Sequence, residues 1–175
     1  MSTKPWLLVV EDDVDVREAI LDSLTEVECE IETAENGKEG LEKVKTGKFT
    51  AVMSDINMPI MNGLDFLAEV RKWGSDIPFV VLSAFADKQN TVKALRMGAM
   101  DFLDKPFDID QLIEVINRAL SLGAKVRELD AELQKMQEQK NLTTEQVKQL
   151  REAKKFMMMM RFEANEAKDK SKKSA

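Results

Sequence analysis

Several residue types are absent or scarce in this chain of 175 residues. It contains no histidine, which excludes histidine general bases, histidine metal ligands and a histidine that donates a phosphoryl group. Its single cysteine, Cys29, cannot form a disulfide within the chain, which indicates a reducing compartment, and we expect the cytoplasm. No apolar run reaches the roughly 18 residues of a membrane span, and the N-terminal residues lack the apolar core of a signal peptide. Composition therefore excludes many enzyme classes and a membrane-spanning role.

Charge is distributed unevenly along the chain. Residues 1–120 hold 13 lysines and arginines against 23 aspartates and glutamates, whereas residues 121–175 hold 13 against 9. This change from net acidic to net basic marks a boundary between structural units. We expect one domain over residues 1–122, a helical extension over residues 123–167 and a disordered basic tail over residues 168–175.

Short apolar runs alternate with segments of helical periodicity in the first 120 residues. The expected strands are Trp6–Val10, Cys29–Thr33, Thr50–Ser54, Pro78–Leu82 and Asp101–Leu103. The expected helices are Val14–Glu26, Gly37–Lys45, Gly63–Trp73, Asp87–Met97 and Asp108–Leu120. Five alternating strand and helix units predict an α/β fold with a doubly wound, five-stranded parallel sheet.

Three carboxylates follow two of these strands. Asp12 and Asp13 come after the first strand and Asp55 ends the third, so a doubly wound sheet brings them to its carboxyl edge, where ligands bind. Such a cluster repels itself unless a hard cation is bound, and Mg²⁺ suits because it prefers oxygen ligands. With Mg²⁺ present a carboxylate can attack a phosphoryl group, and Asp55 is the candidate nucleophile.

Two further polar residues end later strands of the sheet. Ser83 could donate its hydroxyl proton to a phosphoryl oxygen, and Lys105 could place a positive charge beside the same oxygens. The Lys105–Pro106 bond could be cis, and the sequence does not show the isomer. Taken singly, acidic residues after a strand often only cap the next helix, and a lone serine or Lys-Pro pair is usually structural. Their joint occurrence at the ends of different strands argues for a site.

At these residues the sequence resembles the receiver domains of two-component response regulators, over about residues 5–122. The resemblance rests on VVEDD at 9–13, DINMPIMNGLDFL at 55–67, LSAFAD at 82–87 and GAMDFLDKPF at 98–107, in this order. It implies a flavodoxin-like sheet of strand order 2-1-3-4-5.

The resemblance also implies roles for particular residues. Asp55 would be the phosphoacceptor, with Ser83 and Lys105 completing the catalytic set. Mg²⁺ would be held by Asp12, Asp13, Asp55 and the backbone carbonyl of Asn57.

The same resemblance implies how phosphorylation is sensed and lost. Ser83 and Phe102 would be switch residues that reshape the face made by the fourth helix, fifth strand and fifth helix. Because Phe102 has no hydroxyl, a packing change must couple the two states, and the alternative is that Phe102 is permanently buried. Phe85 could shield the acyl phosphate from water, so we expect slow autodephosphorylation.

The implied function is a signalling module. A sensor histidine kinase or phosphotransfer protein would phosphorylate Asp55 in a Mg²⁺-dependent reaction that the domain itself catalyses. We expect no separate enzymatic output, and signalling through contacts with an unidentified downstream protein or through dimerisation.

The extension carries a heptad-like apolar seam. Its members are separated by four, three, four and three residues and are Leu122, Val126, Leu129, Leu133 and Met136. A capping box of Thr143 and Gln146 indicates a helix break over residues 141–144. Gly123 weakens a continuous helix by about 1 kcal/mol relative to alanine.

Two arrangements of the extension stay open. One is a coiled coil that makes a homodimer through residues after Leu122, which we favour, and the other is a helical hairpin that folds back on its own domain. The methionine run from Met157 to Met160 suits docking to a partner, although ordinary helix packing would use it equally well.

Other functions fit less well. DNA binding is not expected, because residues 142–153 only faintly resemble the opening of a DNA-binding output domain and the chain offers no complete recognition helix; a truncated or atypical DNA-binding regulator is the alternative. A haloacid dehalogenase-like enzyme needs a second acid where this chain has Asn57. A structural scaffold with a vestigial receiver conflicts with the complete set of candidate site residues.

Overall fold

The computed structural model describes residues 4–84, 88–140 and 142–156, and these fall into two compact units, Met1–Ala124 and Lys125–Ala175. The strands are β1 (Trp6–Val10), β2 (Glu30–Ala34), β3 (Ala51–Asp55), β4 (Phe79–Ala84) and β5 (Asp101–Lys105). The helices are α1 (Val14–Ser23), α2 (Gly37–Val44), α3 (Gly63–Lys72), α4 (Lys88–Arg96) and α5 (Ile109–Lys140). In the described part of the chain, no helix is long and apolar enough to cross a membrane.

The first unit is built on one five-stranded sheet in which every pairing is parallel. The strand order is β2-β1-β3-β4-β5, which confirms the predicted doubly wound, flavodoxin-like fold. Strand β5 extends to Lys105, beyond the expected Leu103, because it pairs with β4 as far as Ala84.

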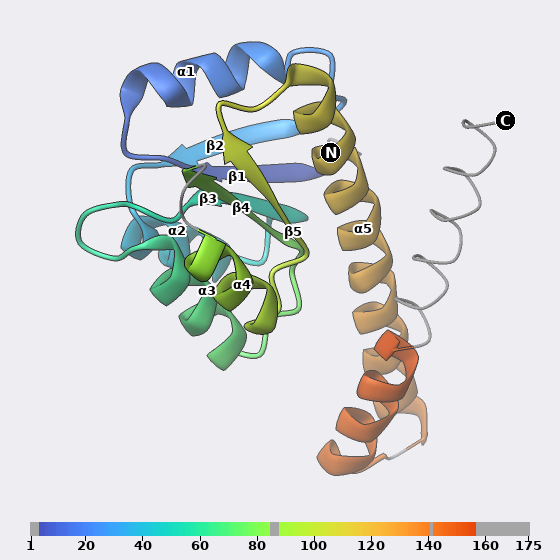
Figure 1. The fold of residues 1–175 in the computed structure, drawn as a ribbon. Coiled ribbons are helices and arrows are strands. Elements are labelled where there is room, and N and C mark those ends of the chain that lie inside the picture. The colour runs from blue at the N-terminus through green and yellow to red at the C-terminus, as the bar shows by residue number, and fades with distance from the viewer. Residues whose placement is uncertain (1–3, 85–87, 141, 157–175) are drawn as a thin grey trace, which may run out of the picture. The chain divides into compact units, whose positions relative to one another are not determined.

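Both faces of the sheet are covered, which is why its central strands are apolar at successive positions. Leu7 to Val10 in β1 are completely buried, with odd and even positions contributing to different core clusters. Leu8 packs in a cluster with residues of α2, α3 and α4, whereas Leu7 packs in a cluster with residues of α1 and α5. Figure 1 shows this division, with α1 and the first part of α5 on one side of the sheet and α2, α3 and α4 on the other.

Strand register places the candidate site. Val10 pairs with Ser54, and Asp55 pairs with Leu82, the residue before Ser83. Lys105 pairs with Ala84 at the end of β5. Because all strands run in the same direction, their carboxyl ends share one edge, and the predicted polar residues gather there.

Helix α5 runs without interruption through Gly123, where the sequence suggested a weak point. A Cβ atom at this position would lie 1.9 Å from the carbonyl oxygen of Thr50. Gly123 therefore permits close packing between α5 and the chain entering β3.

The second unit contains the end of α5 and a further helical segment at residues 144–156. The predicted capping box is confirmed: Thr143 N–H donates to Gln146 Oε1 at 2.9 Å, and Gln146 N–H donates to Thr143 Oγ1 at 3.3 Å. Across the turn, Arg151 pairs with Asp130 at 3.0 Å.

A second ion pair, between Lys154 and Glu132 at 2.9 Å, strengthens the same arrangement. The segment 144–156 thus folds back on α5 as a hairpin within the extension. The tail over residues 168–175 and the run from Met157 to Met160 lie outside the described residues.

Candidate functional site

Asp55 is held at the carboxyl end of the central strand β3. Its side chain is 10% exposed, and its Oδ1 atom accepts a hydrogen bond of 2.7 Å from the Ile56 N–H. Its Oδ2 atom lies 3.0 Å from Lys105 Nζ. One oxygen is thus fixed by the backbone and the other faces a cation.

Lys105 bridges two carboxylates. Besides Asp55, its ammonium group donates to Glu11 Oε2 at 2.7 Å. The Lys105–Pro106 peptide bond is cis. The predicted association of Lys105 with Asp55 is therefore present in the geometry, and Glu11 is an additional partner.

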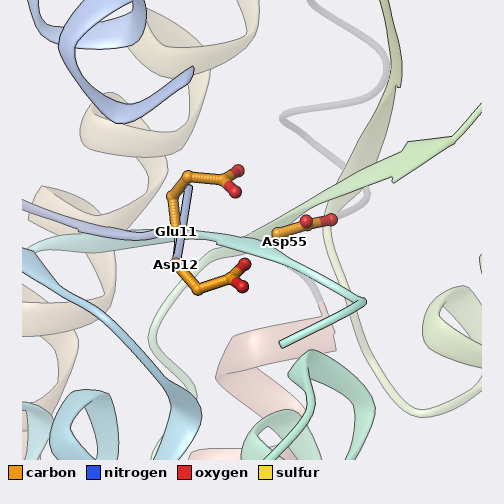
Figure 2. Close-up of side chains that lie close together, drawn as sticks. All are labelled: Glu11, Asp12 and Asp55. Atoms are coloured by element: carbon orange, nitrogen blue, oxygen red, sulfur yellow. The ribbon is translucent and has the colours of Figure 1, made fainter. Parts of the chain in front are cut away.

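Glu11, Asp12 and Asp55 form an acidic cluster, with one oxygen from each within 4.8 Å of the others. Figure 2 shows the side chains of Glu11 and Asp12 reaching from the end of β1 toward the side on which Asp55 lies. Three converging carboxylates are a donor set that fits Mg²⁺, which takes few carboxylates and keeps several waters.

The sequence placed Asp13 in this cluster, and the structure places it elsewhere. Its carboxylate caps α1 by accepting a 3.0 Å hydrogen bond from the Val16 N–H, which is the alternative to metal binding that the sequence leaves open. Sequence reasoning missed Glu11. Its place in the sequence could have identified it, because Glu11 is the first residue after β1 and therefore lies at the carboxyl edge of the sheet.

Arg17 contacts the backbone of the loop that carries Glu11 and Asp12. Its Nη1 atom donates to the carbonyl oxygen of Glu11 at 2.6 Å and is 3.5 Å from that of Asp12. The guanidinium also pairs with Glu35 at 3.6 Å, and the Arg17 side chain is only 12% exposed. These contacts of the Arg17 guanidinium limit the conformations of the loop that carries Glu11 and Asp12.

Burial and charge oppose each other in this cluster. Burial raises the pKa of Glu11, the nearby Asp55 carboxylate raises it further, and the hydrogen bond from Lys105 acts against both. For Lys105, burial alone would lower the pKa, but the hydrogen bonds to Glu11 and Asp55 outweigh it and the pKa is raised. Lys105 is therefore a cation at neutral pH.

The loop after Asp55 turns back closely over that residue. The Gly63 N–H donates to the Ile56 carbonyl at 2.9 Å, and a Cβ at Gly63 would lie 2.0 Å from the Asp55 carbonyl oxygen. Only glycine allows this approach. Asn57 is exposed in the same loop, and the role of its carbonyl as a metal ligand stays a prediction.

The two predicted switch residues lie on neighbouring strands. Ser83 in β4 is fully buried, and its Oγ lies 3.1 Å from the Oγ1 of Thr91 in α4. Phe102 in β5 is half-buried and packs against the core cluster that contains Ala94 of α4. Phe85, predicted to shield the site, lies outside the described residues.

Comparisons with known proteins agree with this geometry. The family model described as the response regulator receiver domain matches residues 7–117. The chain belongs to the response regulator receiver family. The receiver resembles a solved receiver domain of NtrX from Brucella abortus at 34% identity and a TM-score of 0.62, covering 66% of this chain and 98% of that one. It also resembles the chemotaxis response regulator CheY4 of Vibrio cholerae at 30% identity and a TM-score of 0.62, covering 67% and 100% of the two chains.

Curated relatives match the receiver and continue beyond it. A probable transcriptional regulatory protein of Picosynechococcus sp. is 39% identical over 120 residues, which is 65% of this chain and 48% of the relative. The DNA-binding transcriptional regulator NtrC of Klebsiella pneumoniae is 34% identical over 113 residues, which is 65% of this chain and 24% of the relative. The chain thus matches 48% and 24% of the length of these two regulators.

Proposed function

We propose that this receiver accepts a phosphoryl group on Asp55 from a sensor histidine kinase or phosphotransfer protein, in the cytoplasm. The observation that supports this most is the contact of Asp55 Oδ2 with Lys105 Nζ at 3.0 Å, beside the acidic pair Glu11 and Asp12. A nucleophilic carboxylate, a fixed cation and metal-binding oxygens are the parts that phosphoryl transfer needs.

In the proposed reaction, an Asp55 carboxylate oxygen forms a bond to phosphorus while the bond from phosphorus to the donor histidine nitrogen breaks. The electron pair of the broken bond leaves with that nitrogen, which takes up a proton. Lys105 stays protonated and interacts with the phosphoryl oxygens, and the Ser83 hydroxyl donates a hydrogen bond to one of them.

A Mg²⁺ ion held by Glu11, Asp12 and Asp55, with the predicted carbonyl of Asn57, would neutralise charge on the oxygens that approach one another. The role of Asp13 that we propose is the cap of α1 that positions this loop. The domain would have no other catalytic output, and slow autodephosphorylation stays a prediction.

Incubation with acetyl phosphate and Mg²⁺, followed by intact-mass measurement, tests the proposal. We expect the mass of one phosphoryl group on the wild type and none on Asp55→Ala. An unmodified wild type, or an equally modified variant, would contradict it.

We propose that the phosphorylated receiver signals through contacts with other proteins. Two arrangements of the extension, a dimeric coiled coil and a helical hairpin, remain to be distinguished. A homodimer through residues after Leu122 is the prediction from the seam. The ion pairs of Asp130 with Arg151 and of Glu132 with Lys154 support a hairpin that is complete within one chain. Light scattering over a wide concentration range, with and without phosphorylation, separates them: a dimer mass supports the coiled coil, and a monomer in both states supports the hairpin.

DNA binding is the second candidate, and it rests on the similarity to NtrC, a DNA-binding transcriptional regulator of which this chain covers 24%. The described residues of the extension include no strand and no third helix that could complete a DNA-binding unit. Salt-dependent binding to duplex DNA would support this candidate, and its absence at low salt would exclude it.

A further inference from the structure

Helix α4 is held on the sheet by few buried side chains. Of its residues Lys88–Arg96, all of them described, only Thr91 and Ala94 are buried, while Val92 and Leu95 face outward. Helix α3, in contrast, buries large apolar side chains, namely Leu64, Phe66, Leu67 and Val70. Since apolar burial is the main source of packing energy, polar contacts have a larger share in fixing α4 than in fixing α3.

One polar contact of α4 joins the hydroxyls of Thr91 and Ser83. Thr91 Oγ1 donates to Ser83 Oγ at 3.1 Å, and the two residues are 6% and 0% exposed. Ser83 Oγ in turn donates to the carbonyl oxygen of Ala84 at 3.2 Å. A hydroxyl has one proton and two lone pairs, so the hydrogen bond from Thr91 uses only a lone pair of Ser83. The proton of Ser83 remains free to change its acceptor.

We propose that Thr91 is a positioning residue that couples α4 to the phosphorylation of Asp55 through the hydroxyl of Ser83. The inference rests on the proposed function, because it requires a phosphoryl group on Asp55. A charged phosphoryl oxygen is a stronger acceptor than the Ala84 carbonyl, so the Ser83 hydroxyl donates its hydrogen bond to the phosphoryl group instead. Thr91 keeps its hydrogen bond to Ser83 during this exchange and draws the weakly anchored α4 with it.

This route is distinct from a rearrangement of Phe102. The Phe102 ring is half-buried against the cluster that includes Ala94, and it can act on α4 only by packing. Valine keeps the shape of threonine but has no hydroxyl. Thr91→Val therefore removes the hydrogen bond and leaves the packing route in place.

Thr50 provides a matched control. It is 2% exposed, and its hydroxyl accepts from the Trp6 N–H at 3.3 Å, at the opposite edge of the sheet from Asp55. Thr50→Val removes a buried hydroxyl of the same kind, so it reproduces the loss of stability of Thr91→Val without touching Ser83.

The experiment compares amide chemical shifts of α4 before and after treatment with acetyl phosphate and Mg²⁺, at equal phosphorylation as measured by intact mass. In Thr91→Val we expect the equilibrium constant for the α4 rearrangement to fall about fivefold, the effect of one buried hydrogen bond. Thr91→Ser should restore the response, and Thr50→Val should respond like the wild type.

A full α4 response in phosphorylated Thr91→Val would overturn the coupling and leave the proposed function intact. An equal loss of response in Thr50→Val would also overturn it, by showing that general destabilisation suffices. An unphosphorylated wild type would instead overturn the proposed function, and the coupling with it.

Discussion

Replacing Lys105 with methionine should destabilise the receiver and increase its response to Mg²⁺. Methionine retains most of the length and apolar surface of lysine but removes the charge. The variant leaves Glu11 and Asp55, which are 1% and 10% exposed, facing one another without their shared cation.

The size of the effect follows from burial. Removing one partner of a fully buried ion pair lowers the free energy of unfolding by about 3–5 kcal/mol, because the other charge is left buried and unpaired. Because the Lys105 side chain is 24% exposed, solvent screens part of the interaction, and we expect a loss of about 2–3 kcal/mol in the free energy of unfolding. Added Mg²⁺ should recover more stability in the variant than in the wild type, since the bound ion is then the main positive charge at the site.

The loss should also depend on pH in a defined direction. Burial already raises the pKa of Glu11, and without the hydrogen bond from Lys105 that pKa rises further. The folded variant then binds a proton that the unfolded chain has released, so its stability increases as the pH falls from neutrality toward the folded pKa of Glu11. The deficit relative to the wild type is therefore largest near neutral pH and shrinks in mild acid.

Urea unfolding in the presence of EDTA or Mg²⁺, at neutral and mildly acidic pH, measures all three effects. Lys72→Met is the control, because that side chain is 76% exposed and its pair with Glu69 spans 3.4 Å, so its effect should stay within about 0.5 kcal/mol. If Lys105→Met unfolded at the same urea concentration as the wild type in EDTA and gained no more from Mg²⁺, the electrostatic account of the site would be wrong.

Two further predictions concern the scaffold. Gly123→Ala places a Cβ atom 1.9 Å from the Thr50 carbonyl oxygen, so overpacking of about 1–3 kcal/mol should exceed the gain of about 1 kcal/mol in helix propensity. Thermal unfolding should show a lower midpoint, with the exposed Ser121→Ala nearly neutral; a more stable Gly123→Ala would refute the close contact. The hydrogen bond from the Glu35 N–H lowers the pKa of Glu39, so the stabilisation is present above the unfolded value near 4.5 and is lost as the pH falls. Acid titration of stability should therefore be shallower in Glu39→Gln than in the wild type, by a small amount because Glu39 is partly exposed, and equal slopes would contradict the assignment.

Much of the fold could be predicted from the sequence because buried parallel strands leave a clear pattern. Runs such as Trp6–Val10 are apolar at every position, and their alternation with helical segments is enough to predict a parallel sheet. The order of its strands followed from the resemblance to receiver domains. The same reasoning brought Asp55 and Lys105 to one edge, because strand ends converge there whatever the loops do.

Details that change when a strand or helix ends one residue earlier or later could not be predicted in the same way. Whether Glu11 or Asp13 joins the cluster depends on where β1 ends and where α1 is capped, a difference of one or two positions. Gly123 resembled a helix breaker, since the sequence does not show how closely α5 approaches Thr50. Thr91 gave no signal, because a threonine in a helix is ordinary until its hydrogen-bond partner in β4, Ser83, is known.

The most direct test of the central claim identifies the residue that receives the phosphoryl group. Wild-type protein treated with acetyl phosphate and Mg²⁺ can be reduced with borohydride, which converts an aspartyl phosphate to homoserine, and then digested and sequenced by tandem mass spectrometry. We predict homoserine at position 55 and unmodified aspartates at positions 12 and 13. Reduction at another aspartate, or at none, would contradict the assignment of Asp55 as the phosphoacceptor.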